Sequence, residues 1–454
     1  MIDGMETALS AGRAEARVEV RAWQSCIEES CGARFELDER LYVCPRCGGL
    51  LDVLTGKPAM DAHALREVWT ERLASMDERD RSGVWRYREL LPFAEEVQPI
   101  TLSEGNTPLY WARRAAQYCG LRTLRLKHQG CNPTGSFKDT GMTVAVTQAL
   151  RLGARTLVCA STGNTAASLA AYAARADLRC AILVPRGQVS HAKLAQSLDY
   201  GAHVLELEGN FDDAMRVIRE LALDQSIYLV NSINPFRIEG QKTVAAELVQ
   251  QLGWTVPDHL VVPGGNLGNS SALGKGLMEL FELGLIERLP RMWVVQAEGA
   301  APFARMFARA ASGKGDAGIA DTLTPFDSPQ TLATAIKIGA PVSWQKALRA
   351  LRRMGGRALS VSEDEIADAK AVIGRDGIGC EPASATTVAG IRQLVQEGAI
   401  GPDEQVVAIL TGHVLKDADY VIAYHGGQLA GAYQNPPVRV PSDAAAILDY
   451  LKQA

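Results

Sequence analysis

One lysine stands out because a tight turn leads directly into it. Residues 132–139 read Asn-Pro-Thr-Gly-Ser-Phe-Lys-Asp, and a helical pattern follows over 143–152, which places Lys138 in the first turn of a helix. A lysine that forms a Schiff base must be held rigidly and be partly uncharged, because only the neutral amine attacks an aldehyde. The positive end of a helix disfavours the charged ammonium. The alternative is a surface lysine behind a helix cap made by Ser136 or Asp139.

Three further turns are rich in Gly, Ser, Thr and Asn, and each follows an expected strand. They cover residues 161–165 (Ser-Thr-Gly-Asn-Thr), 264–269 (Gly-Gly-Asn-Leu-Gly-Asn) and 411–413 (Thr-Gly-His). Backbone N–H groups at a helix start bind anions, and glycines let the backbone come close to them. Taken singly, each turn could be a packing turn, a strand end or a helix cap by Asn164 or Thr165. Together with the lysine turn, they indicate one binding cleft.

The elements that must position these turns alternate between strand and helix. Short apolar runs predict strands at 156–160, 180–184, 203–208, 227–231, 259–262, 292–297 and 406–410. Longer periodic stretches predict helices at 165–176, 190–200, 211–223, 238–252 and 269–283. This alternation indicates an α/β fold with a mostly parallel sheet covered on both faces, whose ligands bind beyond the carboxyl ends of the strands. The polar segment 311–330 is expected to form a mobile loop near the site or a surface excursion.

Size, charge and cysteine usage bound the class of protein. The 454 residues suffice for one or two domains with their own cores, and the net charge of −5 argues against a general nucleic-acid binder. The first twenty residues contain acidic side chains and no apolar block, and no later apolar run is long enough to cross a bilayer. We therefore expect a cytoplasmic protein without a secretory signal or membrane span. The odd total of nine cysteines favours reduced thiols over a disulfide framework.

The lysine segment also resembles that of a known family. Residues 127–141 (Lys-His-Gln-Gly-Cys-Asn-Pro-Thr-Gly-Ser-Phe-Lys-Asp-Thr-Gly) are similar to the cofactor-lysine segment of threonine synthases, which are pyridoxal-phosphate (PLP) enzymes of the tryptophan-synthase-β fold type, fold type II. The likeness covers most of the chain, including residues 104–109, 161–165, 231–242, 263–269, 338–344 and 410–417. The family often has an acidic residue where Gln129 stands and arginine where Thr140 stands, and both departures only flank the site.

The resemblance implies a domain division and a set of residue roles. It implies an N-terminal Cys-rich ribbon at 1–54, a large PLP-binding α/β domain at 55–140 and 232–454, and a small α/β domain at 141–231. Lys138 is the implied Schiff-base lysine and general base. The other cofactor contacts it implies are Asn164 on the ring oxygen, Thr411 on the pyridine nitrogen, and Gly264, Gly265, Asn266, Leu267, Gly268 and Asn269 around the phosphate. Because the Thr411 hydroxyl is neutral, it does not force the ring to be protonated, and we expect a comparatively weak electron sink.

The implied substrate is O-phospho-L-homoserine, which reacts with water to give L-threonine and phosphate. By resemblance, Ser161, Thr162 and Thr165 hold its carboxylate, and Asn231, Ser232 and Arg237 hold its leaving phosphate. Arg237 offers a planar fork suited to phosphate, although an ion pair with Glu239 is an equal alternative from the residues alone. A homodimer is expected from the family.

Two other functions stay open. One is a related PLP lyase, such as a threonine or serine dehydratase or a synthase that uses O-phosphoserine. The other is a zinc-ribbon nucleic-acid-binding protein, against which the negative net charge and the lack of a basic, aromatic-rich stretch weigh.

Two cysteine pairs lie near the start of the chain. Cys26 and Cys31 are separated by four residues, and Cys44 and Cys47 by two, within Cys-Pro-Arg-Cys-Gly-Gly. This approaches the spacing of a four-thiolate zinc site, although the first pair is wider than usual. Structural zinc and a ribbon that packs without metal are equal alternatives.

Overall fold

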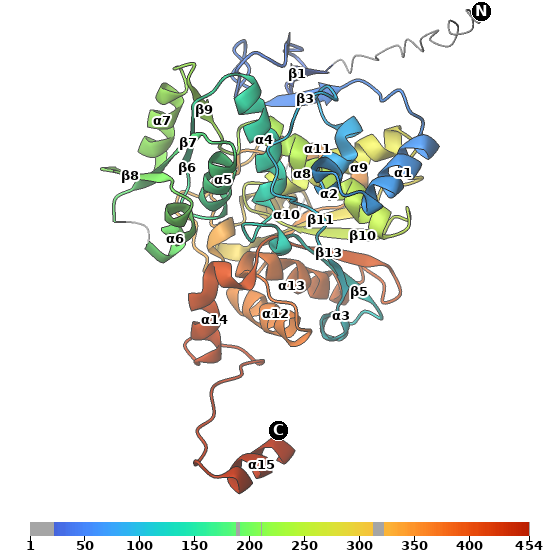
Figure 1. The fold of residues 1–454 in the computed structure, drawn as a ribbon. Coiled ribbons are helices and arrows are strands. Elements are labelled where there is room, and N and C mark those ends of the chain that lie inside the picture. The colour runs from blue at the N-terminus through green and yellow to red at the C-terminus, as the bar shows by residue number, and fades with distance from the viewer. Residues whose placement is uncertain (1–21, 188–190, 210, 312–321, 454) are drawn as a thin grey trace, which may run out of the picture.

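The computed structural model describes residues 22–187, 191–209, 211–311 and 322–453. The expectations for the first twenty residues and for 312–321 of the expected polar loop lie outside these residues. The described chain forms three sheets, with the helices packed around the two larger ones (Figure 1).

The larger parallel sheet has six strands in the order β12-β11-β10-β13-β5-β4. Its strands are β4 (Leu109–Trp111), β5 (Leu124–His128), β10 (His259–Pro263), β11 (Arg291–Ala297), β12 (Ala358–Val361) and β13 (Val406–Leu410). All neighbouring strands are parallel except β4 and β5, which pair antiparallel. Parallel strands direct their carboxyl ends to one edge, and that edge carries the expected turns.

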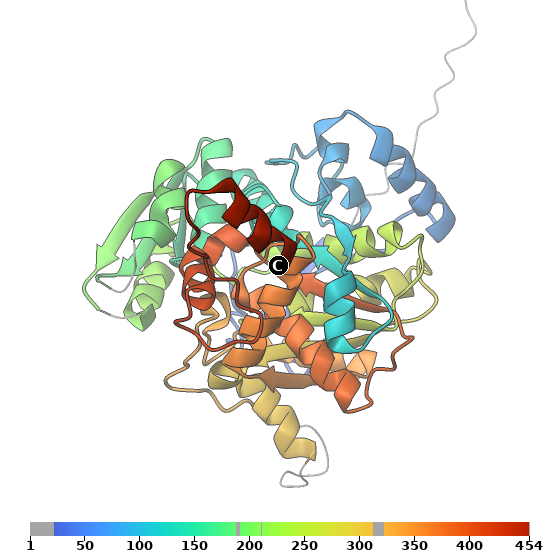
Figure 2. The same ribbon diagram turned by 90° about the horizontal axis from the view of Figure 1, so that it is seen from below.

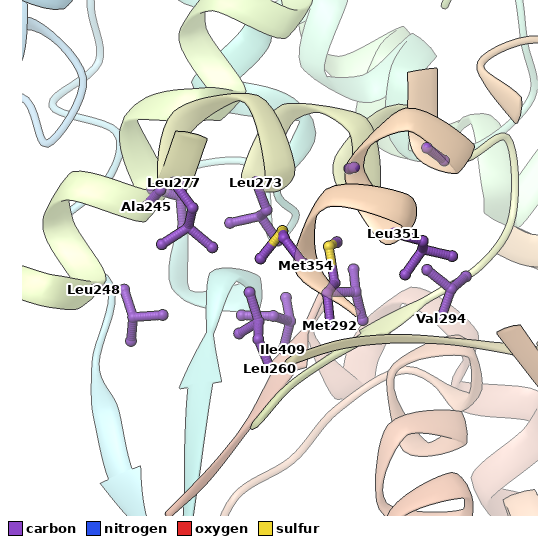
Figure 3. Packing of buried hydrophobic residues seen from close by; sticks show 14 of the residues in the cluster. Ala245, Leu248, Leu260, Leu273, Leu277, Met292, Val294, Leu351, Met354 and Ile409 are labelled. Carbon is purple, nitrogen blue, oxygen red and sulfur yellow. The ribbon is translucent and has the colours of Figure 1, made fainter. Parts of the chain in front are cut away.

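Helices cover both faces of this sheet. One face carries α8 (Phe236–Gln251), α9 (Gly268–Glu282), α10 (Pro302–Ala311) and α11 (Trp344–Met354), and the other carries α3 (Arg113–Cys119), α12 (Glu363–Arg375) and α13 (Pro382–Gln396). Successive strand residues alternate between the two cores: Leu260 packs under the first helix layer and Val261 under the second. Figure 3 shows the first core, where Leu260, Met292 and Ile409 of the strands meet leucines of the helices above them.

The second parallel sheet has four strands in the order β8-β7-β6-β9. Its strands are β6 (Thr156–Ala160), β7 (Arg179–Pro185), β8 (His203–Leu207) and β9 (Ile227–Leu229), and its helices are α4 (Lys138–Arg151), α5 (Asn164–Arg175), α6 (His191–Asp199) and α7 (Phe211–Leu221). The two sheets confirm the predicted α/β class with mostly parallel strands. The predicted strand and helix bounds agree with the observed ones to within two residues, as where β9 ends at Leu229 rather than at 231, and α4 begins at Lys138, the residue predicted to lie in the first turn of a helix. The domain boundaries implied by the resemblance remain predictions.

The third sheet is a small antiparallel ribbon that lies against both larger units (Figure 1). It consists of β1 (Ala22–Cys26), β2 (Arg34–Phe35) and β3 (Leu51–Thr55). The Tyr42 hydroxyl accepts the N–H of Leu229, the last residue of β9 in the four-stranded sheet, at 2.8 Å. On the other side, the Lys346 ammonium of α11 lies 2.7 Å from an Asp52 carboxylate oxygen. The ribbon is therefore fixed to the chain at two separate places.

The remaining elements lie at the periphery. Helices α1 (Ala62–Glu71) and α2 (Glu78–Arg81) follow the ribbon, and α14 (Ala418–His425) follows β13. The final helix, α15 (Ala444–Gln453), lies apart from the body in Figure 1 and in front of it in Figure 2, so it projects outward. No helix within the described ranges is long and apolar enough to span a membrane.

Candidate active site

The lysine turn and the end of β13 are joined through their backbones. Phe137 N–H donates to the Thr411 carbonyl at 2.9 Å, and His413 N–H donates to the Gly135 carbonyl at 2.9 Å. Ser136 and Gly412 pair between them as an isolated antiparallel bridge. Two turns that lie about 275 residues apart in sequence thus form one surface, as the shared-edge argument predicts.

Two glycines bring the lysine helix against α8. A Cβ built on Gly240 of α8 would lie 1.9 Å from the Thr140 carbonyl oxygen, and one on Gly141 of α4 would lie 2.6 Å from the Arg237 carbonyl oxygen. Only glycine allows so close an approach of two helix backbones. This contact places the start of α4, with Lys138, beside the start of α8, with Arg237.

Lys138 is the first residue of α4 and is partly buried. Burial and, to a lesser extent, the Arg237 guanidinium lower the pKa of its amine to about 7, and Glu381 opposes the shift. Its Nζ lies 4.1 Å from the centre of the Phe137 ring and has no hydrogen bond or ion pair to any residue that the structure describes. A large share of the amine is therefore neutral near pH 7, as a Schiff-base nucleophile requires.

The alternative of a capped surface lysine is not observed. The N-cap of α4 is Phe137, which has no side-chain cap hydrogen bond, and the Ser136 hydroxyl accepts the Lys138 N–H only at 3.4 Å. The Asp139 carboxylate instead accepts hydrogen bonds from the Thr134 hydroxyl at 2.6 Å, the Thr134 N–H at 2.7 Å and the Ser168 hydroxyl at 2.6 Å. Asp139 thus ties the lysine turn to α5, and burial raises the pKa of its carboxyl group to about 6.

The glycine-rich turn after β10 forms a backbone cradle at the start of α9. Leu267, the N-cap, adopts a left-handed φ of 63°, and no side chain caps the helix. A Cβ on Gly265 would come within 3.1 Å of Ile336, so the turn has little spare room. The Asn269 side chain is 5% exposed, and both its polar atoms are buried without a partner among the described residues. Free helix N–H groups beside an unsatisfied amide fit a phosphate group.

Asn266 in the same turn holds two other segments. Its Nδ2 donates to the Ser232 hydroxyl at 2.5 Å, and its Oδ1 accepts the Val342 N–H at 2.5 Å. The Asn266 carbonyl also accepts the Ser343 N–H at 3.2 Å. The turn after β10 therefore lies against the residues before α8 and against the 338–344 segment that the sequence analysis singled out.

Arg237 is a buried cation, and two of its three guanidinium nitrogens lack a hydrogen-bond acceptor among the described residues. It is 3% exposed, and the two nitrogens are Nε and Nη1. Burial lowers the pKa of the guanidinium to about 10. The alternative ion pair with Glu239 does not form, because the Glu239 carboxylate pairs with Lys242 and Lys275. A buried guanidinium with two free donors fits an anionic ligand.

Asn231 lies near this arginine, but its amide is already engaged. Its Oδ1 accepts the Ala160 N–H at 3.1 Å, and its Nδ2 donates to the Ala160 carbonyl at 3.0 Å. It therefore holds the end of β6 in place. The assignment of Asn231 to the substrate phosphate stays a prediction.

The turn after β6 leads into α5 without a side-chain cap. The N-cap is Gly163, so the suggested cap by Asn164 or Thr165 does not form. Ser161, Thr162 and Thr165 are partly exposed. An uncapped helix start beside exposed hydroxyl groups can bind a carboxylate.

Glu381, which was not predicted from the sequence, lies at the centre of the site. Its Oε1 accepts the Thr411 hydroxyl at 2.9 Å, and its Oε2 accepts the Asn164 amide at 3.0 Å. The signal was present in the Cys-Glu-Pro-Ala-Ser run at 380–384, where an acidic N-cap precedes Pro382 and an almost wholly buried helix. Lys416 was also missed; its Nζ donates to the Gln196 side chain of α6 at 2.6 Å and links the two larger units.

Comparisons with known proteins agree with this geometry. Residues 100–412 match the family described as pyridoxal-phosphate dependent enzyme. A threonine synthase of Methanocaldococcus jannaschii is 46% identical over 400 residues, which cover 88% of this chain and 94% of that protein. One of Methanosarcina acetivorans is 48% identical over 398 residues, covering 87% and 93%. The solved threonine synthase of Escherichia coli has a TM-score of 0.66 over 95% of this chain and 99% of that chain, at 18% identity, which is a likeness of fold alone.

Proposed function

The chain belongs to the threonine synthases, a group of pyridoxal-phosphate-dependent enzymes, and we propose that it converts O-phospho-L-homoserine and water to L-threonine and phosphate. The observation that supports a phosphorylated substrate is Arg237, a buried guanidinium beside Lys138 with two donor atoms that lack an acceptor among the described residues. The backbone cradle after β10 provides for one phosphate, that of the cofactor. Arg237 provides for a second anion, which a dehydratase acting on free threonine does not need.

Each residue of the site has a distinct role in the proposed reaction. Bound PLP supplies the electron sink that stabilises negative charge on the substrate carbons. Lys138 removes the α proton and moves protons at the β carbon, since its amine is partly neutral at pH 7. Asn164 and Thr411 orient the ring of the cofactor. The residues around its phosphate are Gly264, Gly265, Asn266, Leu267, Gly268 and Asn269.

The substrate contacts follow the same geometry. Arg237, Ser232 and Asn231 hold the leaving phosphate, and Ser161, Thr162 and Thr165 hold the carboxylate. Early protonation would release a keto acid instead of threonine, so the site must admit the reacting water molecule and exclude bulk water until its hydroxyl group has been added.

The test compares products and substrates in the purified, PLP-reconstituted protein. We expect threonine and phosphate in equal amounts from O-phosphohomoserine, with little 2-oxobutanoate, and little product from O-phosphoserine, serine or threonine. Borohydride reduction should fix PLP to Lys138, and Lys138→Ala should remove both the visible absorbance and the activity. Keto-acid formation from free threonine without phosphate-dependent synthesis would favour the dehydratase alternative.

We further propose that Cys26, Cys31, Cys44 and Cys47 bind structural zinc. Their four sulfurs lie within 4.8 Å of one another, with Cys26 and Cys47 at 3.4 Å and Cys31 and Cys44 at 3.7 Å. A tetrahedral ion with Zn–S bonds of about 2.3 Å holds its sulfurs about 3.8 Å apart, so the donor set fits. Metal analysis should find about one zinc per chain, and Cys44→Ser should remove it; a metal-free wild-type protein would support the ribbon that packs alone.

We propose that the protein forms a homodimer and is located in the cytoplasm. Exposed apolar residues on the projecting α15, including Ile447, Leu448 and Leu451, support self-association. Nine unpaired cysteines support a reducing compartment. Light scattering of the purified protein measures its oligomeric state directly, and a monomer across micromolar concentrations would contradict the proposed dimer.

A further inference from the structure

A directed chain of hydrogen bonds ends at Glu381. It begins at Ser384 of α13, whose hydroxyl oxygen accepts the Thr411 N–H at 2.8 Å and the Gly412 N–H at 3.2 Å. Those two bonds use both lone pairs of the Ser384 oxygen, so its one hydrogen must be donated. The Thr411 hydroxyl oxygen, 3.1 Å away, is the acceptor.

The next link passes through Thr411. Its hydroxyl accepts from Ser384 and donates its single hydrogen to Glu381 Oε1 at 2.9 Å. One lone pair remains on this oxygen and no hydrogen. Toward any further partner, Thr411 can therefore only accept.

The carboxylate at the end of the chain is held as an acceptor on both oxygens. Glu381 is 3% exposed, and its Oε2 accepts the Asn164 amide, which can only donate. Its backbone is fixed to Gly412, whose carbonyl accepts the Glu381 N–H at 3.0 Å. A Cβ on Gly412 would lie 2.3 Å from the carboxyl carbon, so no side chain fits between them. Burial raises the pKa of Glu381, while both donors and the charges of Lys138 and Lys416 favour the ionised form.

We propose that Glu381 is a positioning residue that orients the Thr411 hydroxyl as an acceptor and thereby keeps the ring nitrogen of bound PLP protonated. The inference rests on the proposed function, in which Thr411 faces that nitrogen. It reverses the sequence-based expectation of a comparatively weak electron sink, which considered the neutral hydroxyl without the carboxylate behind it. A protonated ring withdraws electrons more strongly, which suits a reaction that removes protons from two adjacent carbons.

The test measures the ring nitrogen itself. The full-length protein is reconstituted with PLP labelled with ¹⁵N at the pyridine nitrogen, and its NMR shift is recorded with the cofactor bound to Lys138. We expect the shift of a protonated ring in the wild type. In Glu381→Gln, the amide oxygen must face the donor Asn164, so the amide NH₂ faces Thr411. The Thr411 hydrogen is then released toward the ring, and the shift should move to the unprotonated range.

Two further variants distinguish this role from a general loss of structure. Ser384→Ala removes the first donor but leaves Thr411 donating to Glu381, so the ring should stay protonated. Thr411→Val removes the acceptor, so the ring should lose its proton even where Glu381→Gln does not fold. An unprotonated ring in the wild type, or a protonated ring in Thr411→Val, would overturn the proposal. Failure of the proposed function would instead appear as absent visible absorbance and no borohydride adduct on Lys138.

Discussion

Replacement of Arg237 by methionine should weaken substrate binding and raise the pKa of Lys138 without lowering the stability of the fold. The guanidinium has two donor atoms without partners, Nε and Nη1. If both bind the substrate phosphate, each charge-assisted hydrogen bond contributes roughly 1.5 kcal/mol at the lower end of the usual range. Their joint loss of about 3 kcal/mol corresponds to a KM for O-phosphohomoserine raised about 150-fold. Folding stability should not fall, because the variant removes a buried charge that no described residue neutralises.

The same substitution should change the titration of Lys138. The Arg237 charge is second only to burial in lowering the pKa of this amine to about 7. Without it, the midpoint for Schiff-base formation with added PLP should move to higher pH. Arg186→Met, at an exposed surface pair with Glu208, is the matched control and should change neither quantity. The reasoning is refuted if Arg237→Met unfolds at a lower denaturant concentration with an unchanged KM, since the guanidinium would then be structural.

Four further results are expected. In the wild type, the rate of PLP capture should rise with pH through about 7 and then level off, because the Lys138 amine is protonated below that pH; a flat rate from pH 6 to 9 would contradict this. Gly240→Ala should separate α4 from α8 and lower the free energy of unfolding by about 1–3 kcal/mol or more. It should also weaken PLP binding in an absorbance titration. The control Gly374→Ala, which has open space around its Cβ, should be neutral or stabilising. Leu260→Ala, fully buried under α8 and α9, should lower the free energy of unfolding by about 2–5 kcal/mol in chemical denaturation. Burial alone would raise the pKa of Asp52, but Lys346, Lys275 and Arg349 lower it to about 2. Its contribution of about 2 kcal/mol is therefore present above pH 4 and lost as the pH falls toward 2, and Asp52→Asn should abolish that acid-dependent loss in Trp fluorescence.

The sequence was sufficient for the fold class and for most strands. Strands β6, β10 and β13 lie where apolar runs predicted them, because a buried parallel strand must be apolar on both faces. Lys138 was correctly placed in the first turn of α4, although residues 138–142 show no helical periodicity of their own. Their burial comes from tertiary contacts: Thr140 and Gly141 pack against α8.

The site was predicted in part for a related reason. Turns such as 264–269 can be read from the sequence, because their glycine and asparagine content is itself the local signal. Glu381 and the pair Gly141 and Gly240 act through partners between 30 and about 220 residues away. A single sequence carries no information on such pairings, so these residues were missed although their types were visible.

The site combines features that work against folding and become useful with a ligand. Lys138 and Arg237 place two cations close together in a poorly solvated region, each with a lowered pKa. Asn269 buries both polar atoms of its amide, and neither has a hydrogen-bond partner in the part of the chain that the structure describes. Such groups cost free energy in the ligand-free chain, and an anion that satisfies them regains it on binding. The alternation of apolar strands and close helix packing supplies the stability that allows this edge to remain unsatisfied, while both carboxylate oxygens of Glu381 accept hydrogen bonds from Asn164 and Thr411.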